Sequence, residues 1–207
     1  MWHVRNDDDP QAFSELVSRW HRPILGLCIR MTGDRHRGED LVQETFARLF
    51  AHRKTYEPTG KFSTFLWRIA VNLCYDELRK INRRGELSLE ESEATSPGSI
   101  DLESNDPSPD QSLVDNERAR AVRDALLQLP ESHRVVLVLR HYEGLKLREI
   151  GVILGIPEGT VKSRMFDALG QLSQLLNPLI SDVPEAFKPD TAPGTNSISR
   201  PPERLLI

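Results

Sequence analysis

No apolar run in this 207-residue chain approaches the roughly eighteen residues that a membrane-spanning helix needs. The first nine residues, Met1–Asp9, also lack the apolar stretch of a secretory signal peptide. Hydrophobic residues still make up 38% of the chain, which is enough to build buried cores. We therefore expect a cytoplasmic protein without membrane insertion.

Cysteine is scarce, and metal-ligand spacing is missing from the sequence. Cys28 and Cys74 lie within apolar helical patterns, which favours two buried free thiols over a disulfide or a metal site. The six histidines are scattered. The sequence also lacks a phosphate-binding loop and a paired nucleophile and base. These absences argue against an enzyme, and we expect no cofactor.

The net charge of −4 argues against a nucleic-acid partner, but the distribution of charge does not. Residues 1–84 carry 15 basic and 11 acidic side chains, and residues 118–177 carry 9 basic and 6 acidic side chains. Residues 85–117 carry 10 acidic side chains and no basic ones. Two mildly basic blocks therefore flank an acidic connector, an arrangement that the overall charge hides.

Helical periodicity dominates the N-terminal block. Apolar residues recur at steps of three and four between residues 13 and 31, which predicts one helix, or two helices meeting near Pro23. A second helix is expected at about residues 37–53. A third is expected at about residues 63–84, with Ser63 as its N-cap.

The rest of the chain divides into three parts. Residues 85–117 are rich in Ser, Pro, Asp and Glu, which is typical of a flexible linker. Residues 118–177 return to helical periodicity, and residues 178–207 lose it again, so we expect a mostly disordered tail there. Residues 10–84 and 118–177 would then be two small all-α domains joined by the acidic linker.

An ordered polar face lies on the second expected helix. Asp40, Gln43 and Glu44 share one side of it. Val42 and Phe46 lie on the opposite, apolar side. A solvated surface would explain this face, and so would a docking site for a partner helix that carries Arg and Lys.

An aromatic segment, residues 61–67, overlaps the start of the third expected helix. A stripe of mostly basic residues follows it along the same helix. Arginines along one line suit phosphate contacts, asparagine can contact a base edge, and aromatic rings can hold unstacked bases. Aromatic core residues with solubilising arginines would give the same pattern. The stripe consists of Arg68, Asn72, Tyr75, Arg79 and Arg83.

Residues 147–164 have the pattern of a helix-turn-helix, a motif that places its second helix in the DNA major groove. Gly155 suits the left-handed residue that ends the first helix, and Pro157 suits the start of the second. The expected core residues are Ile150, Ile153, Leu154 and Val161.

Three strings occur in a fixed order: D-x-x-Q-E-x-F at residues 40–46, F-S-T-F-L-W-R-I-A-V-N at 62–72, and G-T-V-K-S-R at 159–164. In this order they resemble bacterial RNA polymerase sigma factors of the extracytoplasmic-function (ECF) group of the sigma-70 family. The resemblance implies a region 2-like bundle and a region 4-like helix-turn-helix. It also implies RNA polymerase core and promoter DNA as partners, and it allows an anti-sigma factor.

The resemblance also implies site residues. It implies contact with the polymerase clamp coiled coil by Asp40, Gln43 and Glu44, with Arg48 and Phe50 at the rim. It implies contact with the promoter −10 element by Lys61, Phe62, Ser63, Thr64, Trp67, Arg68, Asn72, Arg79 and Arg83. It implies contact with the −35 element by Thr160, Lys162, Ser163, Arg164, Asp167 and Gln171. The polymerase flap is a further expected contact.

One departure and one rival interpretation remain. After Arg164 the family usually continues with basic and alanine-rich residues, whereas here Asp167 and Gly170 follow. This difference predicts fewer phosphate contacts and leaves open which −35 sequence the helix prefers.

A polymerase-independent helix-turn-helix regulator would explain residues 118–176. It would leave the face around Asp40 without a role.

Overall fold

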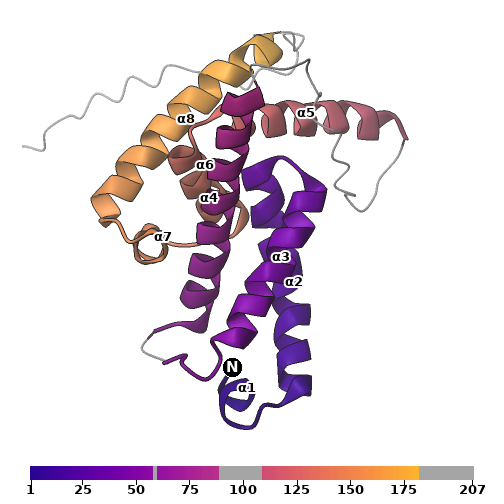
Figure 1. The fold of residues 1–207 in the computed structure, drawn as a ribbon. Coiled ribbons are helices and arrows are strands. Elements are labelled where there is room, and N and C mark those ends of the chain that lie inside the picture. The colour runs from indigo at the N-terminus through magenta and orange to yellow at the C-terminus, as the bar shows by residue number, and fades with distance from the viewer. Residues whose placement is uncertain (58–59, 89–108, 182–207) are drawn as a thin grey trace, which may run out of the picture.

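The computed structural model describes residues 1–57, 60–88 and 109–181. All regular elements in these ranges are helical, so the all-α prediction is confirmed (Figure 1). In chain order they are α1 (Trp2–Asn6), α2 (Pro10–Thr32), α3 (Arg35–Ala51), α4 (Phe62–Ser88), α5 (Pro109–Gln128), α6 (Glu131–Leu137), the π-helical turn η1 (Val138–Tyr142), α7 (Leu147–Leu154) and α8 (Glu158–Ser181).

Helix α2 begins and ends at chemically defined residues. The Asp9 carboxylate accepts hydrogen bonds from the backbone N–H groups of Gln11 at 2.8 Å and Ala12 at 3.2 Å. Gly33, with φ of +75°, ends the helix in the left-handed conformation. Between these points α2 runs through Pro23 without a break, so the alternative of two helices is wrong. Ile24, which directly follows Pro23, is fully buried, so packing in the core stabilises the helix beyond the proline.

Helix bounds differ most around the acidic segment. Helix α4 begins at Phe62, one residue before the expected Ser63, and continues to Ser88. Helix α5 begins at Pro109. Helices therefore enter the expected linker, residues 85–117, from both sides. The remainder of that segment, and the expected tail beyond Ser181, lie outside the described residues.

A short N-terminal helix, α1, precedes the elements that were expected from the sequence. It buries Val4 completely. The turn after it is tied to the turn that follows α3, because the Asp8 carboxylate lies 2.6 Å from Arg53 Nε and 2.7 Å from Lys54 Nζ. Hydrogen bonds from Lys54 and Arg53 hold the pKa of Asp8 below its usual value.

One continuous apolar core joins the N-terminal and C-terminal helices. Helices α2, α3 and α4 pack against one another, and α8 packs on α6 and α7. The two groups also meet, since α4 contacts α7 and α2 contacts α5, α6 and η1. Figure 1 shows α4 as the central helix, with α2 and α3 on one side and α6, α7 and α8 on the other. The two blocks expected to be separate domains therefore lie against each other.

The two cysteines are free and fully buried, as expected, with their Sγ atoms 3.7 Å apart. The hydrogen bond to Cys28 and burial raise the pKa of the Cys74 thiol well above its usual value. Because the thiolate is the reactive form, a disulfide reagent such as DTNB should modify the native protein only as fast as it unfolds. A Ser14→Cys variant, exposed on α2, should react at once. Prompt labelling of the native wild type would contradict this burial.

Candidate functional site

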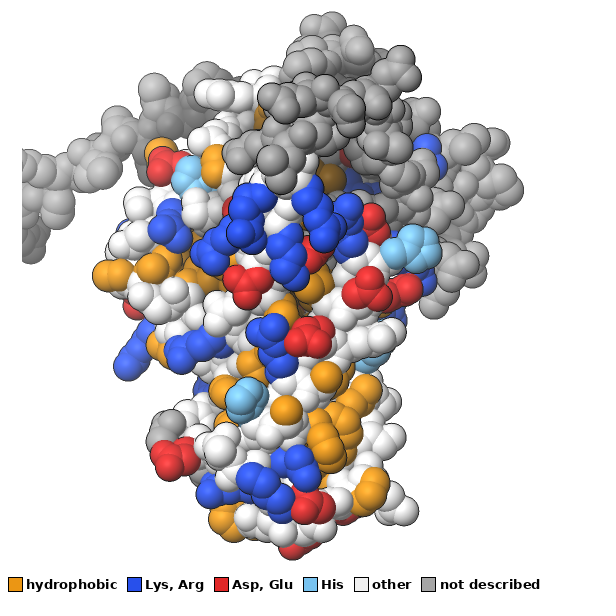
Figure 2. All heavy atoms as spheres, in the orientation of Figure 1, with side chains coloured by type: hydrophobic (Ala, Val, Ile, Leu, Met, Phe, Trp, Pro, Cys, Tyr) orange, Lys and Arg blue, Asp and Glu red, His pale blue; other side chains and the backbone are white. Residues whose placement is uncertain are grey.

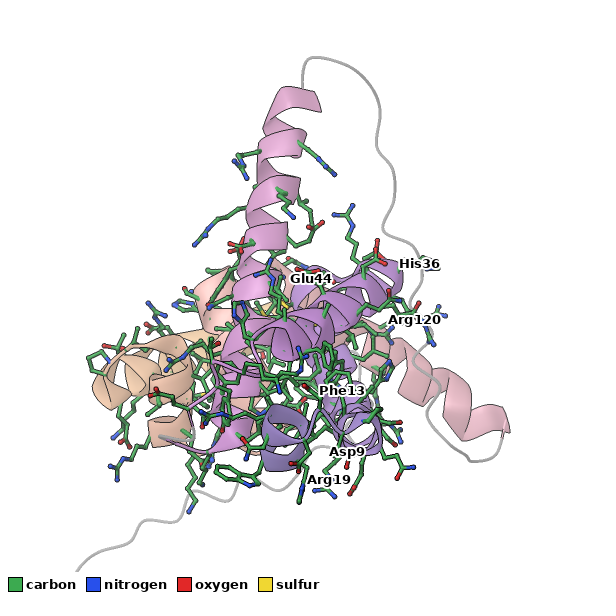
Figure 3. All side chains as sticks on the ribbon, turned by 60° about the horizontal axis from the view of Figure 1, so that its bottom comes forward. Asp9, Phe13, Arg19, His36, Glu44 and Arg120 are labelled. Carbon is green, nitrogen blue, oxygen red and sulfur yellow. The ribbon has the colours of Figure 1, made fainter. Side chains whose placement is uncertain are left out.

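The polar face of α3 is exposed along its length. Asp40, Gln43 and Glu44 are exposed, whereas Val42 and Phe46 on the opposite side are buried. Figure 3 shows Glu44 midway along α3. The three polar side chains therefore contribute nothing to the core and are available to a partner.

A groove of about 960 Å³ separates this face of α3 from α4. Its α3 wall includes Asp40, Glu44 and Arg48, and its α4 wall includes Arg79 and Lys80. The Glu44 carboxylate lies 2.7 Å from Arg48 Nε, and both side chains are about half exposed. Exposed pairs of this kind contribute little to stability, so they can exchange for charges on a partner.

Phe50 lies at the end of the same helix and is 40% exposed. Its ring packs on Phe13 with centroids 5.1 Å apart. The Arg53 guanidinium covers the ring at 3.9 Å. Phe50 is thus an exposed apolar side chain that Phe13 and Arg53 hold in place.

The structure corrects the assignment of Trp67 to the −10 contact. Its side chain is 3% exposed and meets Trp20 edge-on, with centroids 5.9 Å apart. The physical reason is helical spacing, because Val71 and Cys74 lie one and two turns further along the same buried side of α4. Trp67 is a core residue, and an indole buried there does not stack on a base.

The other residues expected at the −10 element divide by exposure. Ser63 and Thr64 are partly buried. Phe62 is also partly buried, between Trp20 at 6.3 Å and Tyr56 at 6.2 Å. The exposed members of the set are Lys61, Arg68, Asn72, Arg79 and Arg83.

A pocket of about 370 Å³ lies where the loop after α3 meets α4. Asn72 lines it, together with Thr55 and Tyr56 from the loop and Phe65 from α4. Tyr56 and Phe65 are in ring contact at 5.1 Å. The pocket therefore combines aromatic surface with the amide of Asn72, which suits one unstacked base.

The basic stripe of α4 is interrupted at Tyr75. Burial raises the pKa of Tyr75 to about 12. Arg79 and Arg83 are exposed beyond it. Figure 2 shows Lys and Arg side chains gathered over the upper part of the molecule, where the C-terminal half of α4 lies. The structure thus separates Arg79 and Arg83 from the pocket at Asn72.

The helix-turn-helix forms as expected. Ile150, Ile153 and Val161 are buried. Gly155 ends α7 with φ of +68°. A second glycine, Gly151, is required by close approach, because a Cβ there would lie 2.8 Å from the carbonyl oxygen of Ile156. Only the Gly155 requirement was expected from the sequence.

The residues expected at the −35 element also divide by exposure. Lys162, Ser163 and Asp167 are exposed on α8, whereas Thr160 and Gln171 are partly buried. Arg164 is partly buried as well and lines a cavity of about 740 Å³ together with Tyr75 and Arg79 of α4. Arg164 is thus turned toward α4.

Two polar contacts tie the start of α4 and the residue before it to α7, and no sequence pattern indicated either contact. Lys61 Nζ lies 2.7 Å from a Glu149 carboxylate oxygen. Arg68 donates a hydrogen bond of 2.6 Å to the carbonyl oxygen of Val152. Hydrogen bonds from Lys61 and from the Lys146 backbone hold the pKa of Glu149 below its usual value.

A buried arginine, Arg134, forms a third tie between the two blocks. It is 7% exposed. Its guanidinium donates to the carbonyl oxygen of Met31 at the end of α2, and to those of Leu127 at 2.6 Å and Leu129 at 3.0 Å. Burial lowers the pKa of Arg134. These carbonyl oxygens partly compensate for the loss of water around the charge.

The family model for Sigma-70 region 2 matches residues 16–84, and that for Sigma-70 region 4 matches residues 119–172. The ECF RNA polymerase sigma factor SigW of Bacillus subtilis is 34% identical over 174 residues, which cover 83% of this chain and 92% of SigW. The chain is an ECF sigma factor of the sigma-70 family. The first match contains α3 and most of α4, and the second contains the helix-turn-helix.

One further relative supports the family assignment, and one solved structure supports the fold. The RNA polymerase sigma-H factor of Pseudomonas aeruginosa is 32% identical over 84% of this chain and 91% of its own. A solved structure of the sigma factor RpoE in complex with the anti-sigma factor NepR, from Bartonella quintana, superposes with a TM-score of 0.66 at 22% identity. It covers 81% of this chain and 98% of that one, and it supports the fold. Within the described ranges, every helix is too short or too polar to cross a membrane.

Proposed function

We propose that this sigma factor is a non-catalytic subunit that binds RNA polymerase core and directs it to promoters by recognising −10 and −35 elements. Three separate surfaces support the proposal: the exposed face of α3, the pocket at the start of α4, and the exposed side of α8. The single observation that carries it is that region 2 and region 4 sequences match in this order. A polymerase-independent regulator would not need the region 2 surfaces.

Core polymerase would bind the face formed by Asp40, Gln43 and Glu44, with Arg48 and Phe50 at its rim. The acidic and amide groups suit a clamp coiled coil that presents Arg and Lys, since complementary charge favours encounter and fixes register. Phe50 would add apolar contact at the edge. The buried side of α3 keeps the face rigid without contribution from these residues.

The −10 element would be recognised at the pocket beside Asn72. Tyr56 and Phe65 would hold one unstacked base, and the amide of Asn72 would contact its edge. Lys61 and Arg68 would contact the flanking phosphates. Arg79 and Arg83, further along α4, would contact upstream duplex. Trp67 takes part only by supporting α4 from the core.

The −35 element would be contacted by the N-terminal part of α8, where Lys162 and Ser163 are exposed. Lysine there suits a phosphate and serine suits either a phosphate or a base edge. Asp167 follows one turn later and would repel phosphate, unless its carboxylate accepts a hydrogen bond from a cytosine amine. The polymerase flap would contact the same C-terminal block.

Lys162→Ala should weaken duplex binding on all sequences and reduce the slope of log affinity against log salt by about one unit, because one counterion fewer is released. Arg120→Ala, an exposed arginine on α5, is the matched control and should leave the slope unchanged. Fluorescence anisotropy of labelled duplex over a salt series measures both. An unchanged slope for Lys162→Ala would remove α8 from the DNA contact.

The proposed function is tested by adding the protein to purified core polymerase. The complex should co-elute in gel filtration and should make promoter DNA reactive to permanganate, which modifies unpaired thymines. Asn72→Ala should still co-elute but should reduce that reactivity. Failure of the wild-type protein to bind core would contradict the proposal.

A further inference from the structure

The cavity of about 740 Å³ that Arg164 shares with α4 has a basic wall. Arg79 comes from α4, Arg134 from α6 and Arg164 from α8, the three helices that lie close together in Figure 1. Among the described residues that line the cavity, Glu131 is the one acid. Three positive charges and one negative charge therefore surround a space of the size that holds a small molecule.

Arg134 is the buried member of this wall, at 7% exposed. Its guanidinium donates to backbone carbonyl oxygens, and its Nε atom has no hydrogen-bond partner in the described part of the chain. The carboxylate of Glu131 acts on this charge from a distance, and it accepts a hydrogen bond from Asn82 at 3.3 Å. A buried cation without a paired counter-ion is costly, so the wall favours a bound anion.

Arg164 is a second cation without a counter-ion. Its side chain is partly buried, and among the residues that the structure describes its guanidinium has neither an ion pair nor a hydrogen bond. Burial raises the pKa of Tyr75, whereas the charges of Arg164 and Arg79 act in the opposite direction, so both guanidinium groups lie near its hydroxyl. Arg79 lies 3.3 Å from Asp76, but both side chains are more than half exposed and such a pair is weak. Arg164 and Arg79 can therefore both bind an added anion.

The other polar groups of the wall can donate hydrogen bonds to the same anion. Guanidinium groups bind phosphate through paired N–H···O bonds, and hydroxyl and amide groups can donate to the remaining oxygens. A phosphate group carries about two negative charges, which matches the excess of positive charge on this wall better than a carboxylate does. The donors are Tyr75, Gln128 and Ser132, and the neighbouring apolar groups are Leu129 and Pro130.

We propose that this cavity binds a small phosphorylated molecule, with Arg164 and Arg79 holding its phosphate oxygens and Arg134 supplying a buried positive charge. A small anion is favoured over the backbone of a DNA duplex, because Arg134 is buried and Arg164 partly buried, and a rigid duplex reaches exposed groups. Binding needs neither polymerase nor promoter, so the free chain can be tested independently of the proposed function.

Inorganic pyrophosphate is the probe, and isothermal titration calorimetry on the full chain measures its affinity. Arg164→Gln should weaken binding by about tenfold or more, because it removes hydrogen bonds from a charged donor. Arg79→Gln, at a more exposed position, should also weaken it and serves if the first variant fails to fold. Arg120→Gln is the matched control, since Arg120 is exposed on α5 and does not line the cavity.

Glu131→Gln should have the opposite effect. It removes the negative charge from the wall and retains the oxygen that accepts from Asn82. Affinity for pyrophosphate should rise by about threefold, the range of one partly screened charge interaction. Glu158→Gln makes the same charge change outside the cavity and should leave affinity unchanged. Because one variant weakens binding and the other strengthens it, loss of folding cannot explain both.

A second measurement is thermal unfolding followed by circular dichroism. Pyrophosphate should raise the midpoint for wild type, because a ligand that binds only the folded state stabilises it, and should raise it less for Arg164→Gln. Absence of pyrophosphate binding at millimolar concentration, or equal affinities of wild type and both arginine variants, would overturn the site. Duplex DNA binding that Arg164→Gln weakens, without pyrophosphate binding, would assign the cavity to the DNA backbone and also overturn it. Core polymerase binding, which decides the proposed function, is measured separately.

Discussion

Asp40→Ala combined with Gln43→Ala should abolish binding to RNA polymerase core and leave helical content unchanged. Both side chains are exposed, and the core side of α3 does not use them. Their loss removes one charge and one amide from the proposed docking face, where a rigid partner helix leaves little room for compensation. Gel filtration with purified core measures binding, and far-UV circular dichroism measures helical content.

The matched control is Asp124→Ala with Gln128→Ala. This pair has the same chemistry, one aspartate and one glutamine, exposed one turn apart on α5. It should co-elute with core like wild type. If the α3 double variant also co-elutes, or if it unfolds, the assignment of this face fails.

Trp67→Ala should reduce the free energy of unfolding by about 3–5 kcal/mol, the cost typical of removing a large buried aromatic side chain. The indole is 3% exposed and packs on Trp20, so truncation leaves a cavity in the core shared by α2 and α4. Trp2→Ala is the control, since Trp2 is 62% exposed. Urea denaturation followed by circular dichroism gives both values.

An alternative outcome would restore the DNA role of Trp67. If Trp67→Ala keeps wild-type stability and loses promoter opening, the indole contacts DNA in an arrangement different from this one. If stability falls and opening recovers at low temperature, where the variant is folded, the core role holds.

Local chemistry was sufficient to predict most helices. The apolar spacing of α3 and the glycine at the end of α7 gave their positions within a few residues, because periodicity and left-handed caps are local signals. Pro23 was ambiguous, since the cost of a proline within α2 depends on packing that the sequence does not display. The requirement for glycine at position 151 was missed for the same reason, because it arises from the close approach of the Ile156 backbone, which leaves no room for a side chain.

The candidate site was only partly predictable. The exposed face of α3 followed from helical spacing alone. Trp67 was misassigned because its motif marks the segment and not the direction of each side chain. The contacts of Lys61 and Arg134 join residues far apart in the chain, at Glu149 and Met31, and charge pattern does not specify such pairs.

The most direct test of the central claim is transcription by purified core polymerase from a pool of templates with randomised upstream DNA. With this protein added, we expect transcripts whose templates are enriched in two separate short sequence blocks, one near −10 and one near −35. Core alone should give no such enrichment. Transcripts that do not depend on the protein, or enrichment of a single block, would contradict the claim that one chain recognises both promoter elements for the polymerase.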